Sequence, residues 1–321
     1  MFDEQDNLAI VKTELDDVFF QYLAYDGTTP GVATANTGAI FNQIANWDKQ
    51  AYIYEINKDV GLFDIIGETA QVPLDVPAVR NKVTATMKDF AKAIELSKDL
   101  YDDVMHGVWA QDVKKMALKA RVTQDAYAFS KYNGAFTTTL TADGNAAIGT
   151  HNLIGGGTYS NQILAADVGA ATTVLTNDSF NTAMIKMRTM VDQSNVVLGD
   201  TLAYLLVPPA LFQQAIQITE SALVSGNANN NINVWRSAYD VEVYSTPYLA
   251  SVTGIVSGSN TAWFGLSRNH SVTRIIRQGV QTFLRDWGYS NNRTYNYQAN
   301  FREEVVIQDY AGLVGALGNG T

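Results

Sequence analysis

The sequence predicts an α+β fold, in which helices and strands occupy separate runs of the chain. One long amphipathic helix and a second helix fall in its middle, and strand-like segments fill most of its last third. A separate pair of strand-like runs precedes the long helix. A chain of 321 residues can form one large domain or two smaller ones with a core of its own.

The composition permits self-association and excludes several kinds of site. Charged residues make up 17% of the chain, below the usual quarter, so much of the polar surface is neutral and weak at keeping copies apart. The net charge of −10 argues against a protein that binds nucleic acid over its whole surface. Because the chain has no cysteine, disulfides, thiolate zinc sites and cysteine nucleophiles are excluded.

The start of the chain predicts an N-terminal arm over residues 1–46. An amphipathic helix is expected around Leu8–Leu23, followed by a Gly-, Thr- and Ala-rich stretch at Asp26–Gly38; a disordered tail is the alternative. This start lacks the basic segment of a signal peptide, and no apolar stretch is long enough to span a membrane. We therefore expect cytoplasmic synthesis and no membrane contact.

Two runs between residues 51 and 88 predict a long two-stranded hairpin. Residues 51–56 are rich in aromatic and β-branched side chains, and residues 82–88 alternate with a period of two. Gly67, Pro73 and Pro77 favour an extended, irregular connection between them. Because a two-stranded hairpin is only marginally stable alone, we expect it to lie on another surface, its own or a neighbour's.

The clearest helix is predicted at Asp102–Lys131, where apolar side chains recur at helical spacing. Such a helix spans about 45 Å, which is long for a globular domain. A second helix is expected at Ser179–Asp192, with Asn177, Asp178 or Ser179 as its cap. Its methionines are interpreted as core packing.

The rest of the chain predicts mainly strands. Leu202–Val207 is expected to be a buried strand, and Pro208–Pro209 to start a helix that runs to about Glu220. Further strands are expected within 234–247 and at 261–266, 272–276, 280–284, 294–302 and 304–317.

The segment Ala135–Asn161 has the composition of an active-site loop without its chemistry. Gly155 to Gly157 lack the Lys and Ser/Thr of a phosphate-binding loop, and neither HExxH nor GxSxG occurs in the chain. Asp143-Gly144-Asn145 predicts a turn, not a calcium loop. We expect His151 to bond loop backbone, and we expect no catalytic residue, metal or cofactor; an enzyme that uses the His151 loop is the alternative.

Several phrases resemble those of the major capsid proteins of tailed bacteriophages, especially Mu-like head proteins. Residues 61–77, GLFDIIGETAQVPLDVP, followed by 88–104, KDFAKAIELSKDLYDDV, resemble the family's extended loop and its return into a long helix. Residues 141–161 resemble the Mu-like insertion, with its Asp-Gly, His, Gly and Asn. Residues 233–249 resemble the strand before a proline-leucine step, and residues 301–317 resemble the closing strand.

The resemblance implies the Hong Kong 97-type fold and a structural role. Its expected parts are the arm at 1–46, an extended loop at 47–101, a peripheral domain at 102–196 and 264–321, and an axial domain at 197–263. The chain would assemble as hexamers and pentamers into an icosahedral shell around double-stranded DNA, in the virion, after assembly in the host cytoplasm. An encapsulin-like compartment that encloses enzymes is the alternative.

The resemblance also implies partners and contact residues. Scaffolding, portal and decoration functions would belong to separate proteins, and the DNA would be packaged without sequence-specific binding. Independently of the resemblance, the second half of the chain is rich in arginine, which either lies on solvated faces or in ion pairs, or in part faces neighbouring subunits. These residues are Arg236, Arg268, Arg274, Arg277, Arg285, Arg293 and Arg302. Candidate inter-subunit contacts are Glu68, Asp75, Arg80, Lys82, Lys88, Trp235 and Arg236.

Overall fold

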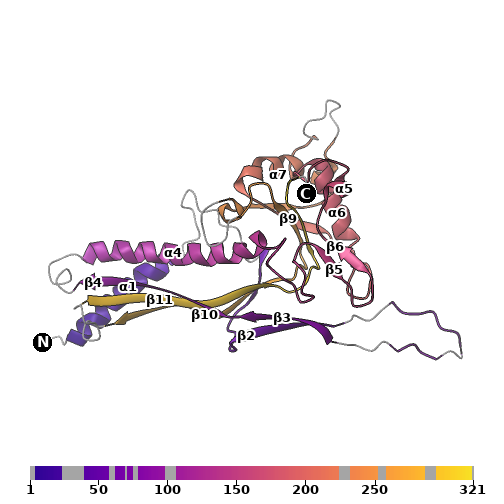
Figure 1. The fold of residues 1–321 in the computed structure, drawn as a ribbon. Coiled ribbons are helices and arrows are strands. Elements are labelled where there is room, and N and C mark those ends of the chain that lie inside the picture. The colour runs from indigo at the N-terminus through magenta and orange to yellow at the C-terminus, as the bar shows by residue number, and fades with distance from the viewer. Residues whose placement is uncertain are drawn as a thin grey trace.

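The chain forms three parts in a computed structural model that describes residues 4–23, 40–57, 62–68, 71–74, 79–97, 106–223, 232–251, 258–285 and 294–319. An elongated platform of helices and long strands occupies one side, and a compact domain stands at its end (Figure 1). A hairpin leaves the junction of the two and leads into an arm, defined here as residues 62–68 and 71–74, which points away from the platform.

A four-stranded sheet with the order β1-β10-β11-β4 forms the platform. Its strands are β1 (Asn42–Ile44), β4 (Lys88–Ser97), β10 (Val272–Arg285) and β11 (Thr294–Ile307). Strands β10 and β11 pair antiparallel, as do β11 and β4, whereas β1 runs parallel to β10. The two strands expected at 272–276 and 280–284 are one strand, because β10 passes through register shifts between Ile276 and Gln281 instead of turning.

Two helices cover this sheet: α1 (Glu4–Leu23) and the long α4 (His106–Asn133). Trp109, Val113 and Met116 of α4 are buried together with Phe19 of α1 and Tyr297 of β11. The spacing of three and four residues on α4 puts these side chains on one face, as the sequence predicts. The N-terminal helix therefore docks on the platform.

A second four-stranded sheet, with the order β12-β9-β7-β8, is the centre of the compact domain. Its strands are β7 (Leu202–Val207), β8 (Glu242–Ser245), β9 (Trp263–Ser267) and β12 (Leu313–Ala316). Around it lie β5 (Thr150–Asn152), β6 (Thr158–Ser160), α5 (Ala165–Val168), α6 (Asn177–Arg188), η1 (Pro209–Leu211), α7 (Phe212–Thr219), α8 (Val234–Ala238) and η2 (Pro247–Leu249).

One core holds the compact domain together across a wide span of sequence. Phe180 and Met187 of α6 are fully buried against Leu205 of β7 and Trp263 of β9. The indole Nε1 of Trp263 donates a hydrogen bond of 3.1 Å to the carbonyl of Thr173, so the buried ring keeps its one polar group paired. The methionines of α6 are core residues, as expected.

Four sequence-based expectations about elements are wrong in detail. Residues 234–247 do not form one strand, because Asn233 caps the short helix α8 before β8 begins. The final strand is two strands in different sheets, since the chain turns between Ile307 and Leu313. Thr176, in extended backbone, caps α6 by accepting from Ser179 N. For residues 88–97 the resemblance implied only a strand that ends at Leu96-Ser97, whereas the whole stretch forms β4.

The predicted hairpin is confirmed, with β2 (Ala51–Asn57) antiparallel to β3 (Val79–Thr86). Its root packs on the platform, where Ala85 and Met87 are buried with Ile275 and Val306. Met87 alone separates β3 from β4, so one extended stretch of chain connects the hairpin with the platform sheet.

Candidate functional site

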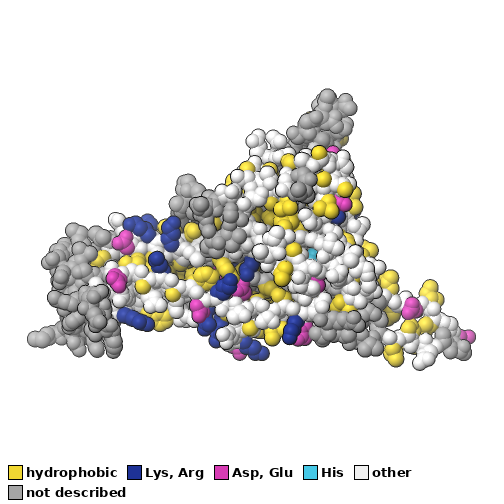
Figure 2. Space-filling model, in the orientation of Figure 1, with side chains coloured by type: hydrophobic (Ala, Val, Ile, Leu, Met, Phe, Trp, Pro, Cys, Tyr) yellow, Lys and Arg dark blue, Asp and Glu magenta, His cyan; other side chains and the backbone are white. Residues whose placement is uncertain are grey.

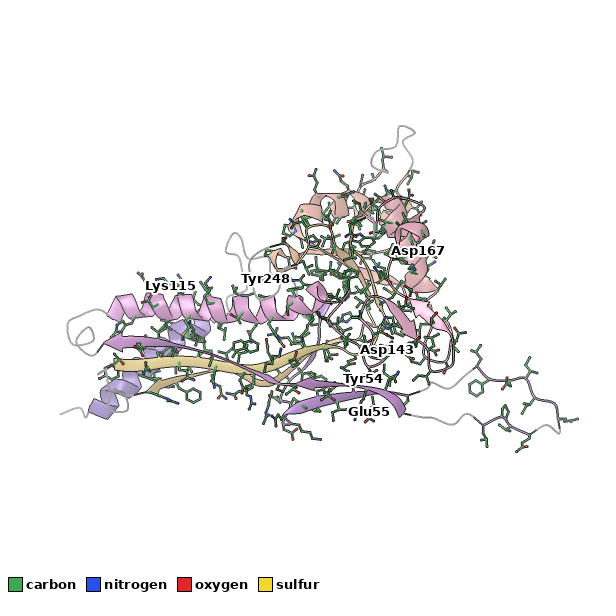
Figure 3. The ribbon with its side chains drawn as sticks, viewed as in Figure 1. Tyr54, Glu55, Lys115, Asp143, Asp167 and Tyr248 are labelled. Carbon is green, nitrogen blue, oxygen red and sulfur yellow. The ribbon has the colours of Figure 1, made fainter. Side chains whose placement is uncertain are left out.

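The arm carries large apolar side chains that nothing in the subunit covers. Phe63 and Ile65 have exposed fractions of 101% and 104%, the values of an isolated chain. The exposed set is Leu62, Phe63, Ile65, Ile66, Val72 and Leu74. The space-filling view shows them as yellow side chains on the part that projects from the molecule (Figure 2), and their sticks point outward on both sides of the projecting chain (Figure 3).

Such exposure needs a cause, because burying one side chain of this size stabilises a protein by about 1.5–3 kcal/mol. Contiguous exposed apolar surface in soluble proteins marks contact sites. The described arm also carries Asp64 and Glu68 and contains no Lys or Arg. Its chemistry is that of an acidic, apolar peptide that requires a covering surface.

A groove of about 580 Å³ lies at the other end of the molecule, between α4 and the platform sheet. Its apolar wall includes Phe90 and Ile94 of β4, Met116 of α4 and Phe301 of β11. The rings of Phe90 and Phe301 stack with centroids 4.8 Å apart.

Four charged side chains also line this groove: Lys92, Asp112, Lys115 and Lys119. Lys115 Nζ lies 2.9 Å from Asp112 Oδ1 in an exposed pair. The charge of the lining is therefore positive overall.

A second cavity, of about 540 Å³, lies at the root of the hairpin and is lined by β3, α4 and β11. Lys131 Nζ lies 2.6 Å from Glu304 Oε1, to which the Tyr127 hydroxyl also donates at 2.6 Å. Burial and the Glu304 carboxylate raise the pKa of Tyr127 far above its usual range. Lys88 holds its ammonium 5.3 Å from the centre of the Tyr127 ring. This cluster joins α4 to β11 and to Lys88, which begins β4 beside the hairpin root.

The platform buries a second acidic cluster next to it. Arg274 donates from Nε and Nη2 to Glu303 Oε2, at 3.1 and 2.7 Å. Burial raises the pKa of Glu303 and Arg274 opposes the shift; the same two effects act on Asp125. Among the interpretations of the later arginines, an ion pair is confirmed for Arg274.

The predicted contact residues fall in three places and do not form one site within a subunit. Glu68 is exposed on the arm, Lys82 is exposed on β3 opposite Glu55, and Lys88 begins β4. Trp235 and Arg236 lie on α8 in the compact domain, where the Trp235 ring meets the Phe180 ring edge-on at 5.9 Å. Asp75 and the side chain of Arg80 lie outside the described residues.

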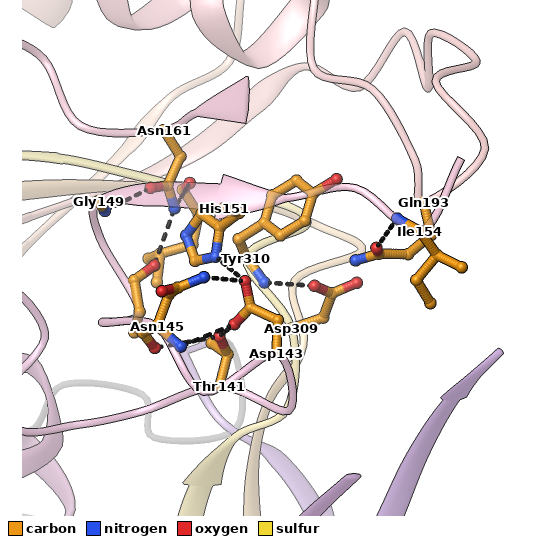
Figure 4. Close-up of polar contacts among 12 residues, drawn as sticks. Thr141, Asp143, Asn145, Gly149, His151, Ile154, Asn161, Gln193, Asp309 and Tyr310 are labelled. Atoms are coloured by element: carbon orange, nitrogen blue, oxygen red, sulfur yellow. Dashed lines mark hydrogen bonds and ion pairs between the residues drawn. The ribbon is translucent and has the colours of Figure 1, made fainter. Parts of the chain in front are cut away.

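The loop around His151 forms a closed polar network (Figure 4). His151 Nδ1 lies 2.9 Å from Asp143 Oδ2, and Asn145 donates to both carboxylate oxygens. The Thr141 hydroxyl also donates to Asp143, and the His151 ring stacks on Tyr310 with centroids 4.5 Å apart. Burial raises the pKa of Asp143, but hydrogen bonds from His151, Thr141 and Asn145 outweigh it and hold the pKa well below its usual range.

This network differs from the expectation for His151 and gives no access to a substrate. The ring bonds a carboxylate instead of loop backbone, because Asp143-Gly144-Asn145 forms the expected turn and directs the carboxylate inward. His151 is fully buried, and its Nε2 has no hydrogen-bond partner among the described residues. A general base must reach the proton that it abstracts, so this geometry fixes the loop and does not place a base in a cleft.

The described residues contain neither a metal site of clustered side chains nor a membrane-spanning helix. No group of three or more His, Asp or Glu side chains there is arranged to hold a metal ion. None of the helices described is both long and apolar enough to cross a membrane.

Sequence reasoning missed the groove because its floor depends on β4. The alternation of Phe90, Lys92 and Ile94 was the available signal, but apolar neighbours Ala91 and Ala93 obscured the period of two.

The chain is similar to known shell proteins. A family model described as phage capsid protein matches residues 80–316. Among curated proteins, none matches this chain in sequence.

Similar solved structures include the capsid of a native GTA particle, at 14% identity and a TM-score of 0.59, covering 92% of this chain and 96% of that one. The capsid of cyanophage P-SCSP1u covers 92% and 91%, at 11% identity and a TM-score of 0.56. A virus-like particle from Pyrococcus furiosus covers 95% and 98%, at 8% identity and a TM-score of 0.54. The fold expected from the resemblance, the Hong Kong 97-type, is confirmed.

Proposed function

The chain belongs to the phage capsid protein family and is a shell subunit, and from that premise we propose that it assembles as hexamers and pentamers into an icosahedral head around double-stranded DNA. Its role is structural, and its place is the capsid of a virion. Assembly in the host cytoplasm, with separate scaffolding, portal and decoration proteins, is part of the proposal. The Mu-like likeness of residues 141–161 stays a prediction.

The observation that carries the proposal is the uncovered arm. A monomer would keep Phe63 and Ile65 in water, whereas in a shell a neighbouring copy can cover them. The low fraction of charged residues, 17%, supports close contact between many copies. The net charge of −10 suits a container that encloses DNA without binding it tightly.

Removal of the arm tests the proposal most directly. Replacing residues 62–74 by a short Gly-Ser linker is expected to leave a folded subunit, because the described arm residues are exposed and contribute nothing to the cores. Light scattering and negative-stain imaging should show capsomers or shells for the intact chain and only small species for the variant. A stable 35.1 kDa monomer of the intact chain at high concentration would contradict the proposal.

The content of purified shells distinguishes a phage head from an encapsulin-like compartment. Double-stranded DNA in shells isolated from infected cells supports the phage head, whereas enclosed enzymes with no nucleic acid would support an encapsulin-like compartment. The enzyme alternative requires an activity that His151→Ala abolishes while a soluble monomer stays intact; burial of His151 argues against it.

The domain division and contact residues are also proposals. We assign an N-terminal segment, distinct from the projecting arm and called the N-terminal arm in the sequence analysis, to 1–46, the extended loop to 47–101, the peripheral domain to 102–196 and 264–321, and the axial domain to 197–263. Since Phe180 and Trp263 share one core, a boundary nearer the end of α4 is the competing division, and limited proteolysis would distinguish the two. Contacts between subunits are proposed at Glu68, Asp75, Arg80, Lys82, Lys88, Trp235 and Arg236.

A further inference from the structure

We propose that the cavity between the root of the hairpin and the end of α4 binds a small phosphate-bearing molecule. Its volume of about 540 Å³ falls within the range of about 300–1,000 Å³ that small-molecule sites occupy. One wall is β3 together with Lys88, the other is the end of α4 with residues 138–140, and β11 contributes the rest of the lining. The cavity shares no lining residue with the groove between α4 and β4.

Two lysines from different elements border this cavity. Lys88 holds Nζ 5.3 Å from the centre of the Tyr127 ring, and Lys131 holds Nζ 5.1 Å from the same centre. Tyr127 itself lines the cavity, so both ammonium groups lie where one bound anion can contact them together. An ammonium group is a compact charge of the kind that binds phosphate in proteins.

The lining of the cavity has a surplus of positive charge. Glu304 is its one acid, and this buried carboxylate already accepts from Lys131 Nζ and from the Tyr127 hydroxyl. Among the described residues, no carboxylate lies within ion-pair distance of Lys88. An anion that enters the cavity therefore meets one uncompensated cation and a second lysine that has further N–H donors.

Three threonine hydroxyls on the two walls are also available as donors. Thr84 and Thr86 line the cavity from β3, and Thr138 lines it from the turn that follows α4. None of these three hydroxyls forms a hydrogen bond with another described residue, whereas the neighbouring Thr139 donates to the carbonyl of Lys131. Donors that stand on both walls can hold the oxygens of one ligand from two sides.

A phosphate group fits this donor set better than a single carboxylate does. A phosphate monoester carries close to two negative charges at neutral pH and three acceptor oxygens, whereas a carboxylate has one charge and two oxygens in one plane. The DNA duplex that the shell is proposed to enclose is a rod much wider than this cavity, so its phosphates stay outside. The ligand is therefore a free phosphate ion or a small phosphate monoester.

A ligand in this place connects the hairpin with the long helix. The hairpin root packs on the platform sheet through Ala85 and Met87. An anion held by Lys88 and Lys131 adds a direct connection to α4. Because a ligand that binds only the folded chain stabilises it, the hairpin keeps its direction more firmly when the site is filled.

Titration of the unassembled full-length chain tests the site, with inorganic phosphate as the probe and chloride at equal ionic strength as the blank. Calorimetry is expected to show one phosphate per subunit. Lys88→Gln should weaken binding about tenfold, because a charged donor is lost, and Lys88→Arg should restore most of it. Lys82→Gln is the matched control, since Lys82 is an exposed lysine of β3 outside the lining. No phosphate binding, or an equal loss in the control, would overturn the proposal.

Hydrogen exchange locates the ligand within the chain. Phosphate is expected to slow amide exchange in peptides that cover residues 83–88 and 127–140, and to leave α6 unchanged. This pattern requires a ligand that contacts both walls, which an ion held loosely by one exposed lysine does not do. Slower exchange on one wall only, or only in other parts of the chain, would contradict the proposal.

Two further probes identify the source of the phosphate. A nucleoside monophosphate that binds more tightly than inorganic phosphate assigns the site to a monoester, whereas equal or weaker binding assigns it to the free ion. A short DNA duplex that displaces inorganic phosphate would overturn the assignment to a small molecule. Each measurement uses single subunits, so its result stands whether or not the chain forms shells.

Discussion

Large apolar side chains are buried in the compact domain and exposed on the arm. In the compact domain Phe180, Met187 and Trp263 are wholly buried, while on the arm Phe63 and Ile65 are wholly exposed. The compact domain completes its core within one chain, so its stability belongs to the subunit. The described arm has no core, and under the proposed function its apolar surface contributes free energy only when copies meet.

The platform is intermediate between these two regions. Its sheet is covered by α4 and α1 through Trp109, Phe19 and Tyr297, yet the groove beside Met116 stays open. The difference between the three parts separates residues that decide folding from residues that decide assembly. Substitutions in each part therefore test which residues stabilise the subunit and which act in assembly.

Trp263→Ala is expected to have the largest effect on the subunit. The ring is fully buried and its Nε1 is hydrogen bonded, so its removal leaves a cavity and costs about 3–5 kcal/mol of unfolding free energy. Urea unfolding followed by fluorescence and circular dichroism measures the change. A loss below about 1 kcal/mol would mean that the core of the compact domain does not depend on this ring.

Arg274→Ala is expected to cost about 3 kcal/mol at neutral pH, because it leaves the buried Glu303 without its ion-pair partner and removes one of the two arginines that act on Asp125. The pKa of each carboxyl is already raised in the folded chain, so the penalty should grow as the pH rises and shrink in acid, where the carboxyls are protonated. Unfolding curves at pH 5 and pH 8 test this direction. Arg236→Ala, at an exposed position, is the matched control.

Asp143→Asn is expected to cost about 1–3 kcal/mol, since a buried carboxylate with several donors is replaced. The pKa of Asp143 is lowered by folding, so its contribution is complete above the ordinary range of a carboxyl and is lost as the pH falls below about 4. The difference between the two proteins should therefore narrow in acid. An equal difference at pH 7 and pH 3.5 would contradict this account, and Asp240→Asn serves as an exposed control.

Phe63→Ser is expected to have the smallest effect on the subunit, within about 0.5 kcal/mol, because the ring touches nothing that its removal would expose. The same substitution should nevertheless impair shell formation, which size-exclusion chromatography and imaging would show. A change that lowers subunit stability while shells form normally would reverse the comparison between the arm and the compact domain.

The sequence predicts best those elements whose pattern is local. The periodic spacing of apolar side chains predicts the apolar face of α4, the alternation in β11 and the hairpin that contains Tyr52 and Val83. The structure confirms all three. The extended course of the arm also follows in part from Gly67 and Pro73, which disfavour a helix.

Long-range pairing accounts for what was missed. Residues 88–97 form a strand because β11 pairs with them along their whole length, while Ala91 and Ala93 obscure their local period of two. The break between Ile307 and Leu313 depends on two sheets competing for one apolar run. The partner of His151 could not be found by spacing, since a turn eight residues away supplies the carboxylate.

The single residue between β3 and β4 has a mechanical consequence. Because only Met87 interrupts the extended chain, tension on the hairpin passes directly into β4, which pairs with β11 over ten residue positions from Lys88 to Ser97. Tension along the strands loads these hydrogen bonds together, in shear, instead of opening them one after another. In the shell that we propose, tension on each hairpin would be shared by the many hydrogen bonds between β4 and β11.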